Sequence, residues 1–449
     1  MASKRDHSPE LVGNPFIKKR NLEWSLELTR SPRDGETDNR EVSEAENAIQ
    51  SRNSDRQVSQ LPRAAAVEAG EAEVSDHLAY FSAILAKSIL KPYPAGLPHL
   101  PISAWQVLYD ANAGFRNGSH FVVHQHDHPV AGTHYDLRLQ INETSSASWA
   151  IMYGLPGDPN SRRLMRNATE TRVHCLWNHL IETGSVSTGS MMIWDTGTYE
   201  VLERRSKHAP AQDPDSQNSS DEEENKWDTQ TQQEKLHRAF QTRKIKIRLN
   251  GTRLPNNYVL NLRLTRDEDA AGRVKSGRKP RTSRRRGTLK IQAKRPEPMT
   301  SSESESEISR KPDDDDCETV DAPAEPDQAG ISAMEREIQE LEDEQVRKTN
   351  AYTGATNTID SVHQRKWFLS MDREASGFVK RRKGGKIEWE RSGEEPIQKG
   401  GDTRWSFPFY VKGAEVERSI VTGRQGADVL RDEGVVGFAK RKGWQAVLN

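Results

Sequence analysis

Short segments in which apolar and polar residues alternate are the feature of this sequence that most limits its fold. They run from Phe121 to Leu264, and Gly, Asn and Pro punctuate the gaps between them. Alternation with a period of two is typical of strands that bury only one face. Many short strands at such close spacing predict a mainly β fold, either a barrel or a sandwich. The predicted strands are FVVHQHDH, THYDLRLQI, SWAIMYGL, SMMIWDTGTYEVL, KIKIRLNGTRL and NYVLNLRL.

Two further segments are expected to pack against this β region. From Ser75 the sequence reads SDHLAYFSAILAKSIL, where a capping Ser precedes apolar residues at helical spacing. We therefore expect an N-terminal helix that ends before Pro92. The segment KWFLSMD, at 366–372, is a lone apolar strand that needs an existing sheet to pair with. We expect it to complete the β domain despite its distance in sequence.

The rest of the chain is too polar to predict a second large core. Only 33% of residues are hydrophobic, 30% are charged and the mean hydropathy is -0.89, so much of the chain cannot bury enough apolar surface to offset its ordering entropy. The predicted organisation is a disordered region at 1–75, a β domain at 76–264 with a disordered loop at about 206–234, a disordered basic and acidic insertion at 265–360, and the last barrel strand with a C-terminal appendage at 361–449.

Positive and negative charge are segregated within the predicted insertion. Residues 273–295 contain many Lys and Arg and no Asp or Glu, whereas the SSESESE run and the four Asp at 313–316 reverse the sign. The basic block is a solvated segment, a nuclear-import signal or a tether that binds nucleic acid. No apolar run is long enough to span a bilayer, and the two cysteines, Cys175 and Cys317, provide no disulfide framework. We expect a soluble protein without membrane contact, nuclear or else cytoplasmic.

The densest group of candidate ligands lies on the first two predicted strands. His134, Asp136 and Arg138 are spaced by two, so their side chains leave the same face of one strand. The short turn before them brings a histidine of the preceding strand beside His134. Two imidazoles and a carboxylate suit Mn, Fe or Zn with open positions, and Arg138 adds the forked donor that phosphate prefers. A merely polar sheet face is the alternative. The histidines that share a face of the preceding strand are His124, His126 and His128.

Basic residues farther along the chain add a second candidate group. They are Arg163 with Arg166, followed by His174 and His179. These side chains would provide a second phosphate contact if the fold made them converge. Alternatively, each is an ordinary surface charge.

The same residues carry a resemblance to a known family, the 3′-phosphoesterase domain of bacterial DNA ligase D. The H-Y-D-x-R-L element at His134 to Leu139 is its most specific part, and the lone strand at Trp367 to Ser370 resembles the family's last strand. The other matching motifs are Phe121 to His126, Ser148 to Ala150, Arg163 to Leu164, His174, Trp194 to Tyr199 and Lys244 to Leu260.

The resemblance implies a compact β-barrel that binds Mn²⁺ and processes 3′ ends of nucleic acid, DNA or DNA/RNA. Such a domain removes a 3′-terminal ribonucleoside and then the 3′-phosphate, leaving a 3′-hydroxyl. The implied metal ligands are His126, His134 and Asp136. Residues implied to hold the phosphate are Arg138, Arg163 and His174, the last also as a general acid or transition-state stabiliser.

The sequence departs from the family pattern at several positions. The interval between His126 and His134 is two residues longer than in the family, which leaves His124 or His128 as substitutes for His126. Arg172 replaces an acidic residue, Asn178 replaces a tyrosine, and the glycine-rich loop is reduced to ETGSVSTG at 182–189. These changes affect the ribonuclease step more than metal binding.

Three hypotheses follow for the function. The first is a Mn²⁺-dependent 3′-phosphoesterase acting in DNA repair, with repair proteins as potential partners. The second is a catalytically silent barrel that binds nucleic-acid ends or a repair partner. The third is a phosphodiesterase for another phosphorylated substrate. Metal-dependent phosphate release distinguishes the enzymes from the silent module.

Overall fold

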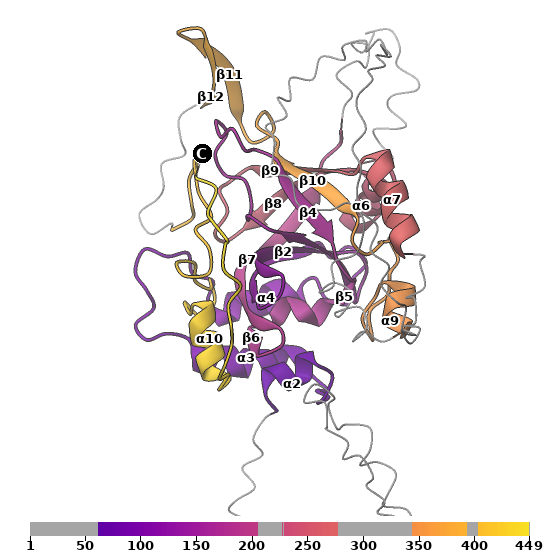
Figure 1. Ribbon diagram of the computed structural model, residues 1–449, viewed down its shortest axis with the longest axis vertical. Coiled ribbons are helices and arrows are strands. Elements are labelled where there is room, and N and C mark those ends of the chain that lie inside the picture. Colours follow the sequence, from indigo (N-terminus) through magenta and orange to yellow (C-terminus); the bar gives the residue numbers. More distant parts are fainter. Residues whose placement is uncertain (1–61, 205–226, 228, 277–343, 393–402, 449) are drawn as a thin grey trace, which may run out of the picture. The chain divides into compact units, whose positions relative to one another are not determined.

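The described part of the chain folds into a closed antiparallel β-barrel (Figure 1). The computed structural model describes residues 62–204, 227, 229–276, 344–392 and 403–448. The barrel strands follow the order β1-β2-β3-β4-β10-β9-β8-β7, and β7 pairs back with β1. This closure confirms the expected mainly β fold and makes it a barrel instead of a sandwich. The barrel strands are β1 (His120–His128), β2 (Gly132–Gln140), β3 (Ser145–Ile151), β4 (Arg166–Glu170), β7 (Gly189–Val201), β8 (Lys244–Gly251), β9 (Tyr258–Arg263) and β10 (Lys366–Met371).

Three short strands were not predicted from the sequence. They are β4, β5 (His174–Cys175) and β6 (Thr183–Ser185). A strand of 5 residues or fewer offers too few positions to establish an alternating pattern. β5 pairs with β3, and β6 pairs with β7.

Alternation along the strands separates an apolar interior from a polar outer face. Trp149, Trp194 and Trp367 are fully buried in the interior core. Phe240 of helix α6 (Gln232–Gln241) joins them, with its ring centroid 5.1 Å from that of Trp367. The inward residues of β2 are Tyr135, Leu137 and Leu139. The polar residues between them therefore face outward.

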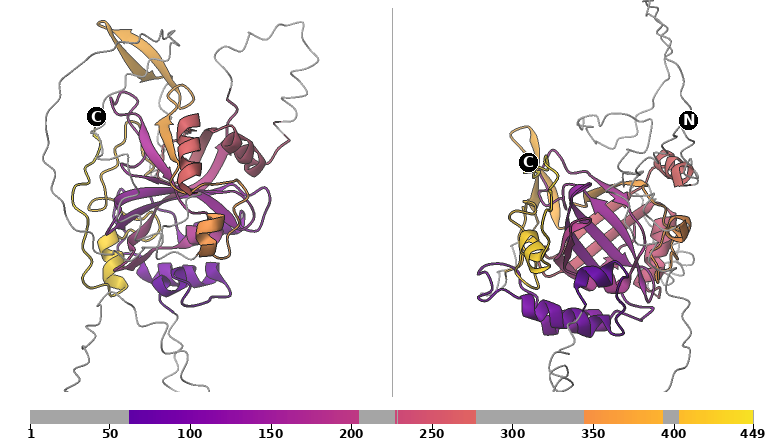
Figure 2. Two further views of the ribbon diagram at one scale, coloured as in Figure 1. Left: turned by 45° about the vertical axis from the view of Figure 1, so that its right-hand side comes forward. Right: turned by 60° about the horizontal axis from the view of Figure 1, so that its bottom comes forward.

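Helices of the N-terminal part cover this outer face (Figure 2). In a second apolar cluster, Phe81 of α3 packs with Val122 of β1 and Ile193 of β7. The side chain of Asp76 caps α3 by accepting a hydrogen bond from the amide of Ala79 at 2.9 Å, so the cap is one residue beyond the expected Ser75. The covering helices are α2 (Ala64–Glu68), α3 (His77–Ser88) and α4 (Ile102–Asp110).

Strand β10 pairs with β4 and β9 and so completes the ring, as expected for the lone apolar segment. A buried carboxylate, Glu170 at the end of β4, fixes this closure. It accepts hydrogen bonds from Arg365 Nε and Trp367 Nε1, each at 2.8 Å, and from Ser361 Oγ at 2.6 Å. The Glu170 side chain is fully buried, and a buried charge is tolerated only with such partners.

We expect Glu170→Gln to lower the free energy of unfolding by about 2 to 3 kcal/mol, because hydrogen bonds to a charged group contribute about 1.5 to 3 kcal/mol and the Arg365 guanidinium loses its counter-charge. Denaturant unfolding measures the change. Glu200→Gln is the matched control, since the Glu200 side chain is 42% exposed and pairs with Arg248 at the surface. Equal stabilities of the two variants would refute this role of Glu170.

Several described helices outside the barrel lie in ranges that we expected from the sequence to be disordered. Helix α2 lies in the range expected to be disordered at 1–75, and α7 (Arg266–Ser276) and α9 (Glu344–Thr349) lie in that at 265–360. The start of α6 falls in the loop expected at 206–234. Residues 1–61, 206–226, 228 and 277–343 of these ranges, with most of the basic block and the whole acidic block, lie outside the described residues.

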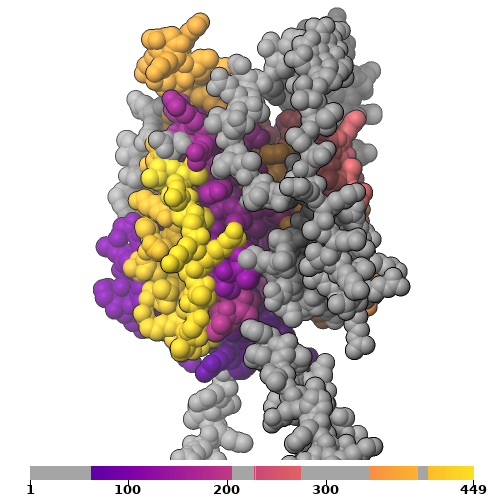
Figure 3. Space-filling model, viewed as in Figure 1, coloured from indigo at the N-terminus to yellow at the C-terminus, as the bar shows by residue number. Residues whose placement is uncertain are grey.

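The C-terminal part consists of a hairpin and a long surface segment. Strands β11 (Phe378–Lys383) and β12 (Lys386–Arg391) form a separate two-stranded sheet, and α10 (Gly426–Asp432) lies in the segment at 403–448. Figure 3 shows this segment in yellow along one face of the molecule, with the hairpin in orange above it. No helix among the described residues is long and apolar enough to cross a membrane.

Candidate metal centre

Strands β1 and β2 bring three predicted ligands together on the outer face of the barrel. The antiparallel register places His126 directly opposite His134. Asp136 is two residues beyond His134 on the same face, and it lies opposite His124. The two residues that lengthen the interval from His126 to His134 are absorbed by the turn before Gly132, so they do not disturb this pairing.

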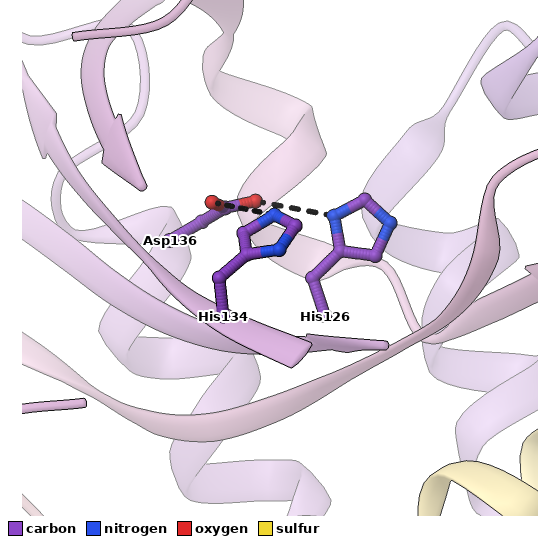
Figure 4. A group of neighbouring side chains, drawn as sticks. All are labelled: His126, His134 and Asp136. Atoms are coloured by element: carbon purple, nitrogen blue, oxygen red, sulfur yellow. Dashed lines mark ion pairs between the residues drawn. The ribbon is translucent and has the colours of Figure 1, made fainter. Parts of the chain in front are cut away.

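The donor atoms of His126, His134 and Asp136 converge on one point (Figure 4). His126 Nδ1 lies 3.5 Å from one carboxylate oxygen of Asp136, and His134 Nε2 lies 3.4 Å from the other. Ligand atoms that each lie about 2.1 Å from a shared ion are separated by about 3.0 to 3.4 Å. The three side chains therefore need only small shifts to hold one cation.

Backbone carbonyls set which nitrogen of each imidazole is free. His134 Nδ1 donates to the carbonyl of Gly132 at 2.8 Å, which leaves the lone pair of Nε2 facing Asp136. His126 Nε2 donates to the carbonyl of Thr188 at 2.7 Å, which leaves Nδ1 facing Asp136. Two imidazole lone pairs thus face one carboxylate, and only a cation or an added proton makes that arrangement favourable.

Electrostatics around the carboxylate favour a bound positive charge. Burial opposes ionisation of Asp136, but His134, His126 and Arg138 hold its pKa well below the usual range. Burial lowers the pKa of His134 despite the nearby Asp136. Burial also acts against a charge on His126, yet Asp136 and the Thr188 carbonyl raise its pKa above the ordinary value. A metal ion at this point therefore competes with a proton on His126.

Arg138 lies next to the three ligands with its guanidinium buried. One terminal nitrogen is 3.5 Å from Asp136 and the other donates to the carbonyl of Asn178 at 3.4 Å, while Nε has no hydrogen-bond partner among the described residues. The side chain is only 2% exposed, so burial lowers the pKa of the guanidinium. A buried donor without a full set of partners suits an anion with several oxygens, such as a phosphate.

His174 joins the same face from β5. Its strand pairs with β3, where Ser146 is opposite His174 and Ser148 is opposite Arg138. Burial and the Arg138 charge keep the pKa of His174 well below the ordinary value, so the ring is neutral. His174 Nδ1 and both serine hydroxyls are buried without partners among the described residues. Buried polar atoms without hydrogen-bond partners among the described residues thus lie between Arg138 and β5.

Arg163 does not join this group. It lies exposed ahead of β4, where its amide contacts Ser161 Oγ and its carbonyl accepts from Arg166. The two alternative histidines are close by but are not part of the three-ligand group. His128 Nδ1 accepts hydrogen bonds from the amides of residues 130 and 131 in the turn, and its ring centroid lies 5.3 Å from that of His126. Both ring nitrogens of His124 are buried without hydrogen-bond partners among the described residues. The assignment of Arg163 to phosphate stays a prediction with no support from its position.

Sequence reasoning missed Glu68, which approaches the centre from outside the barrel. Helix α2 packs against β6, and the charges of His126 and Arg138 act on the Glu68 carboxyl. Burial nevertheless raises the pKa of Glu68 above its ordinary value. The only sequence signal was the short apolar run AAAVE in a polar segment, which is too brief to predict a helix or its contacts.

A buried histidine pair beside the centre makes stability depend on pH. His120 Nδ1 lies 2.7 Å from His179 Nδ1, and burial lowers the pKa of His120 to about 3. The unfolded chain binds protons below about pH 6.5 that the folded chain cannot, so stability falls as the pH drops from there toward 3. We expect His120→Gln to reduce this slope by about 1.4 kcal/mol per pH unit between pH 6 and 4. Unfolding curves at each pH measure it, and unchanged slopes would disprove the assignment.

Comparison with known families gives the same answer as the motifs. Residues 124–262 match the family model described as DNA Ligase D 3′-phosphoesterase domain. This stretch of the barrel is a 3′-phosphoesterase domain of the ligase D type. The resemblance seen in the sequence is thereby confirmed. None of the curated proteins matches the chain.

The phosphoesterase match covers β1 to β9 but not the strand that closes the barrel. Helices α2 to α4, strand β10 and the whole C-terminal part lie outside it. The match assigns the domain to hydrolases of phosphate esters and implies a nucleic-acid substrate. Two departures from the family pattern have structural partners here: Arg172 donates to Asn350 Oδ1 at 3.0 Å, and the carbonyl of Asn178 accepts from Arg138.

Proposed function

We propose that the protein is a Mn²⁺-dependent phosphoesterase that removes a phosphate from the 3′ end of nucleic acid. The observation that carries the proposal is the group of His126, His134 and Asp136, whose acceptor atoms face one another within 4.8 Å. Retained imidazole and carboxylate ligands next to a buried guanidinium suit a phosphate ester far better than a neutral substrate.

The chain's own residues divide the work as follows. His126, His134 and Asp136 would hold the divalent cation, which when bound stabilises charge on a phosphate oxygen and makes water more acidic. Arg138 binds and orients the phosphate through its forked donors. His174, neutral and on the same face, donates a hydrogen bond to the phosphate and so stabilises its charge; with its pKa held so low, the ring carries no extra proton to give to the leaving oxygen as a general acid. Phosphoryl transfer needs positioning and charge neutralisation more than covalent help.

Entry of substrate requires a movement of the covering segments. The side chains of His134 and Asp136 are each 8% exposed, so a nucleic-acid end cannot reach them in the arrangement seen here. Helix α2, whose Glu68 interacts with the Arg138 charge, and the turn that carries Thr188 are two elements that cover the centre. A phosphate would replace the Glu68 carboxylate beside the guanidinium, since both are anions that need the same donor.

The setting that we propose is repair of DNA ends in the nucleus, with repair proteins as partners. Nuclear import is supported by the run of Lys and Arg at 273–295. We also propose a ribonuclease step, in which the same centre removes a 3′-terminal ribonucleoside before it removes the phosphate. Localisation of a tagged chain with and without residues 273–295 tests the import role.

The direct test of the activity is phosphate release from a labelled duplex with a recessed 3′-phosphate. Full-length protein is assayed with Mn²⁺, with EDTA, and as the His134→Ala variant. The proposal expects release only by the unmodified protein with Mn²⁺. A substrate ending in a 3′-ribonucleoside, assayed in parallel, shows whether the ribonuclease step is present.

A silent module that binds ends is the second candidate. It is favoured by the burial of the centre and by Arg172 and Asn178, which replace the acidic residue and the tyrosine of the family pattern. Tight binding of the duplex without phosphate release, under any of several divalent cations, would support this candidate and overturn the enzymatic one.

A further inference from the structure

The β11–β12 hairpin is an exposed basic arm that the phosphoesterase match does not include. It projects beyond the end of the barrel opposite to helices α2 and α3 (Figures 1 and 3). Two glycines at positive φ, Gly384 at 55° and Gly385 at 85°, form its tip. The cations clustered around this tip, all exposed, are Lys380, Arg381, Arg382, Lys383 and Lys386.

The base of the hairpin is anchored firmly. Phe378 is 5% exposed and packs against Phe407 in the barrel core, with ring centroids 5.1 Å apart. The backbone of Trp389 exchanges two hydrogen bonds with the side chain of Asn160, at 2.8 and 3.0 Å. The arm is thus held in one direction, and its charge is presented at a defined place on the molecule.

The strand register divides the hairpin into two different faces. Lys380 is opposite Trp389 and Arg382 is opposite Ile387, so these four side chains share one face that has no acidic residue. Ile387 is 52% exposed there. We call this set of Lys380, Arg382, Ile387 and Trp389 the acid-free face.

Two of the cations on the opposite face, Arg381 and Lys383, are already paired with an acidic residue. Glu390 pairs with Arg381 at 3.3 Å and also with Lys383. Glu388 is directly across from Arg381. A purely solubilising hairpin has no reason to place both of its acidic residues on one side. The asymmetry leaves Lys380, Arg382 and the exposed Ile387 unshielded by acidic residues, whereas the Trp389 ring is partly buried with the Arg373 guanidinium 4.6 Å from its centroid.

We propose that the acid-free face binds the phosphate backbone of a nucleic-acid duplex, away from the 3′ end that the barrel processes. The inference rests on the proposed function only for the identity of the ligand. Lys380 and Arg382 contact phosphates, and Ile387 covers a sugar edge. A two-stranded ribbon has the width to lie along or in a groove of duplex DNA. Such contacts add affinity without sequence preference.

Binding of a duplex of about 30 base pairs, measured over a range of salt concentrations, tests the proposal. The variant is Lys380→Gln/Arg382→Gln in the full-length protein. The matched control is Arg381→Gln/Lys383→Gln, which removes the same charge from the opposite face. Two lost phosphate contacts reduce the slope of log affinity against log salt by about 2 and weaken binding about 10- to 100-fold at low salt. The control is expected to bind within about threefold of the unmodified protein, because both of its cations are shared with Glu390.

Three results would overturn the proposal: no duplex binding by the unmodified protein, equal binding by it and the Lys380→Gln/Arg382→Gln variant, or equal losses in both double variants. Phosphate release from a dinucleotide 3′-phosphate, which is too short to reach the hairpin, is measured alongside. Unchanged release with weakened duplex binding supports the role of the arm. Duplex binding that depends on this face without any phosphate release leaves the arm supported and removes the proposed activity instead.

Discussion

His134→Ala is expected to lower Mn²⁺-dependent phosphate release by at least about a thousandfold. Even partners of metal ligands contribute about 10- to 100-fold, and in the proposed centre His134 would supply one of the three ligand atoms that the described residues bring together. Its Nε2 is also the atom that faces one oxygen of Asp136, so no neighbouring side chain takes its place. Initial rates at saturating Mn²⁺ measure the loss.

The control for this substitution is His128→Asn. His128 lies on the same face of β1 as His126, but its Nδ1 accepts hydrogen bonds within the turn, a role that the Asn carbonyl oxygen can keep. Activity within about threefold of the unmodified protein is expected. A comparable loss in both variants would mean that the histidines act through the turn and not through a shared ion. Thermal unfolding of each variant separates loss of the site from loss of the fold.

Arg138→Lys is expected to lower phosphate release by about 100-fold, the scale of removing one preorganised donor from a charged transition state. Lysine keeps the positive charge but not the planar fork that meets two phosphate oxygens at once. The effect should fall mainly on kcat, because the charge that attracts the substrate is retained. Steady-state kinetics on the recessed 3′-phosphate duplex separate kcat from KM.

Arg163→Lys is the matched control for that variant and also tests the role that the family resemblance gave to Arg163. The residue is exposed ahead of β4, and its contacts run to Ser161 and Arg166. We therefore expect less than a threefold change. A loss as large as that of Arg138→Lys would show that the loop closes over the site when substrate binds.

The sequence predicted the short strands and the shared face of three site residues for a simple physical reason, whereas the barrel and the choice of the three metal ligands were implied by the family resemblance. A spacing of two on a strand decides which side chains share a face, so His134, Asp136 and Arg138 had to project together. The choice among His124, His126 and His128 was open, because spacing alone does not determine how a turn sets the register. The register places His126 directly opposite His134, and it is His126 whose ring nitrogen lies near Asp136.

Contacts between distant segments could not be predicted in the same way. Glu68 reaches the centre from a helix of 5 residues that has no periodic pattern long enough to detect. Arg163 matched a motif, yet a position in a motif does not say whether the residue lies on a strand or in the loop before it. Glu170 and Arg365 are 195 residues apart, and only the closed barrel brings them together.

The measurement that tests the central claim most directly is the stoichiometry of Mn²⁺ binding to the metal-stripped, full-length protein, followed by electron paramagnetic resonance of free Mn²⁺. We predict that each chain removes one ion from solution and that Asp136→Asn removes none at the same concentrations. Binding that persists in Asp136→Asn, or no binding by the unmodified chain, would contradict the existence of this metal centre.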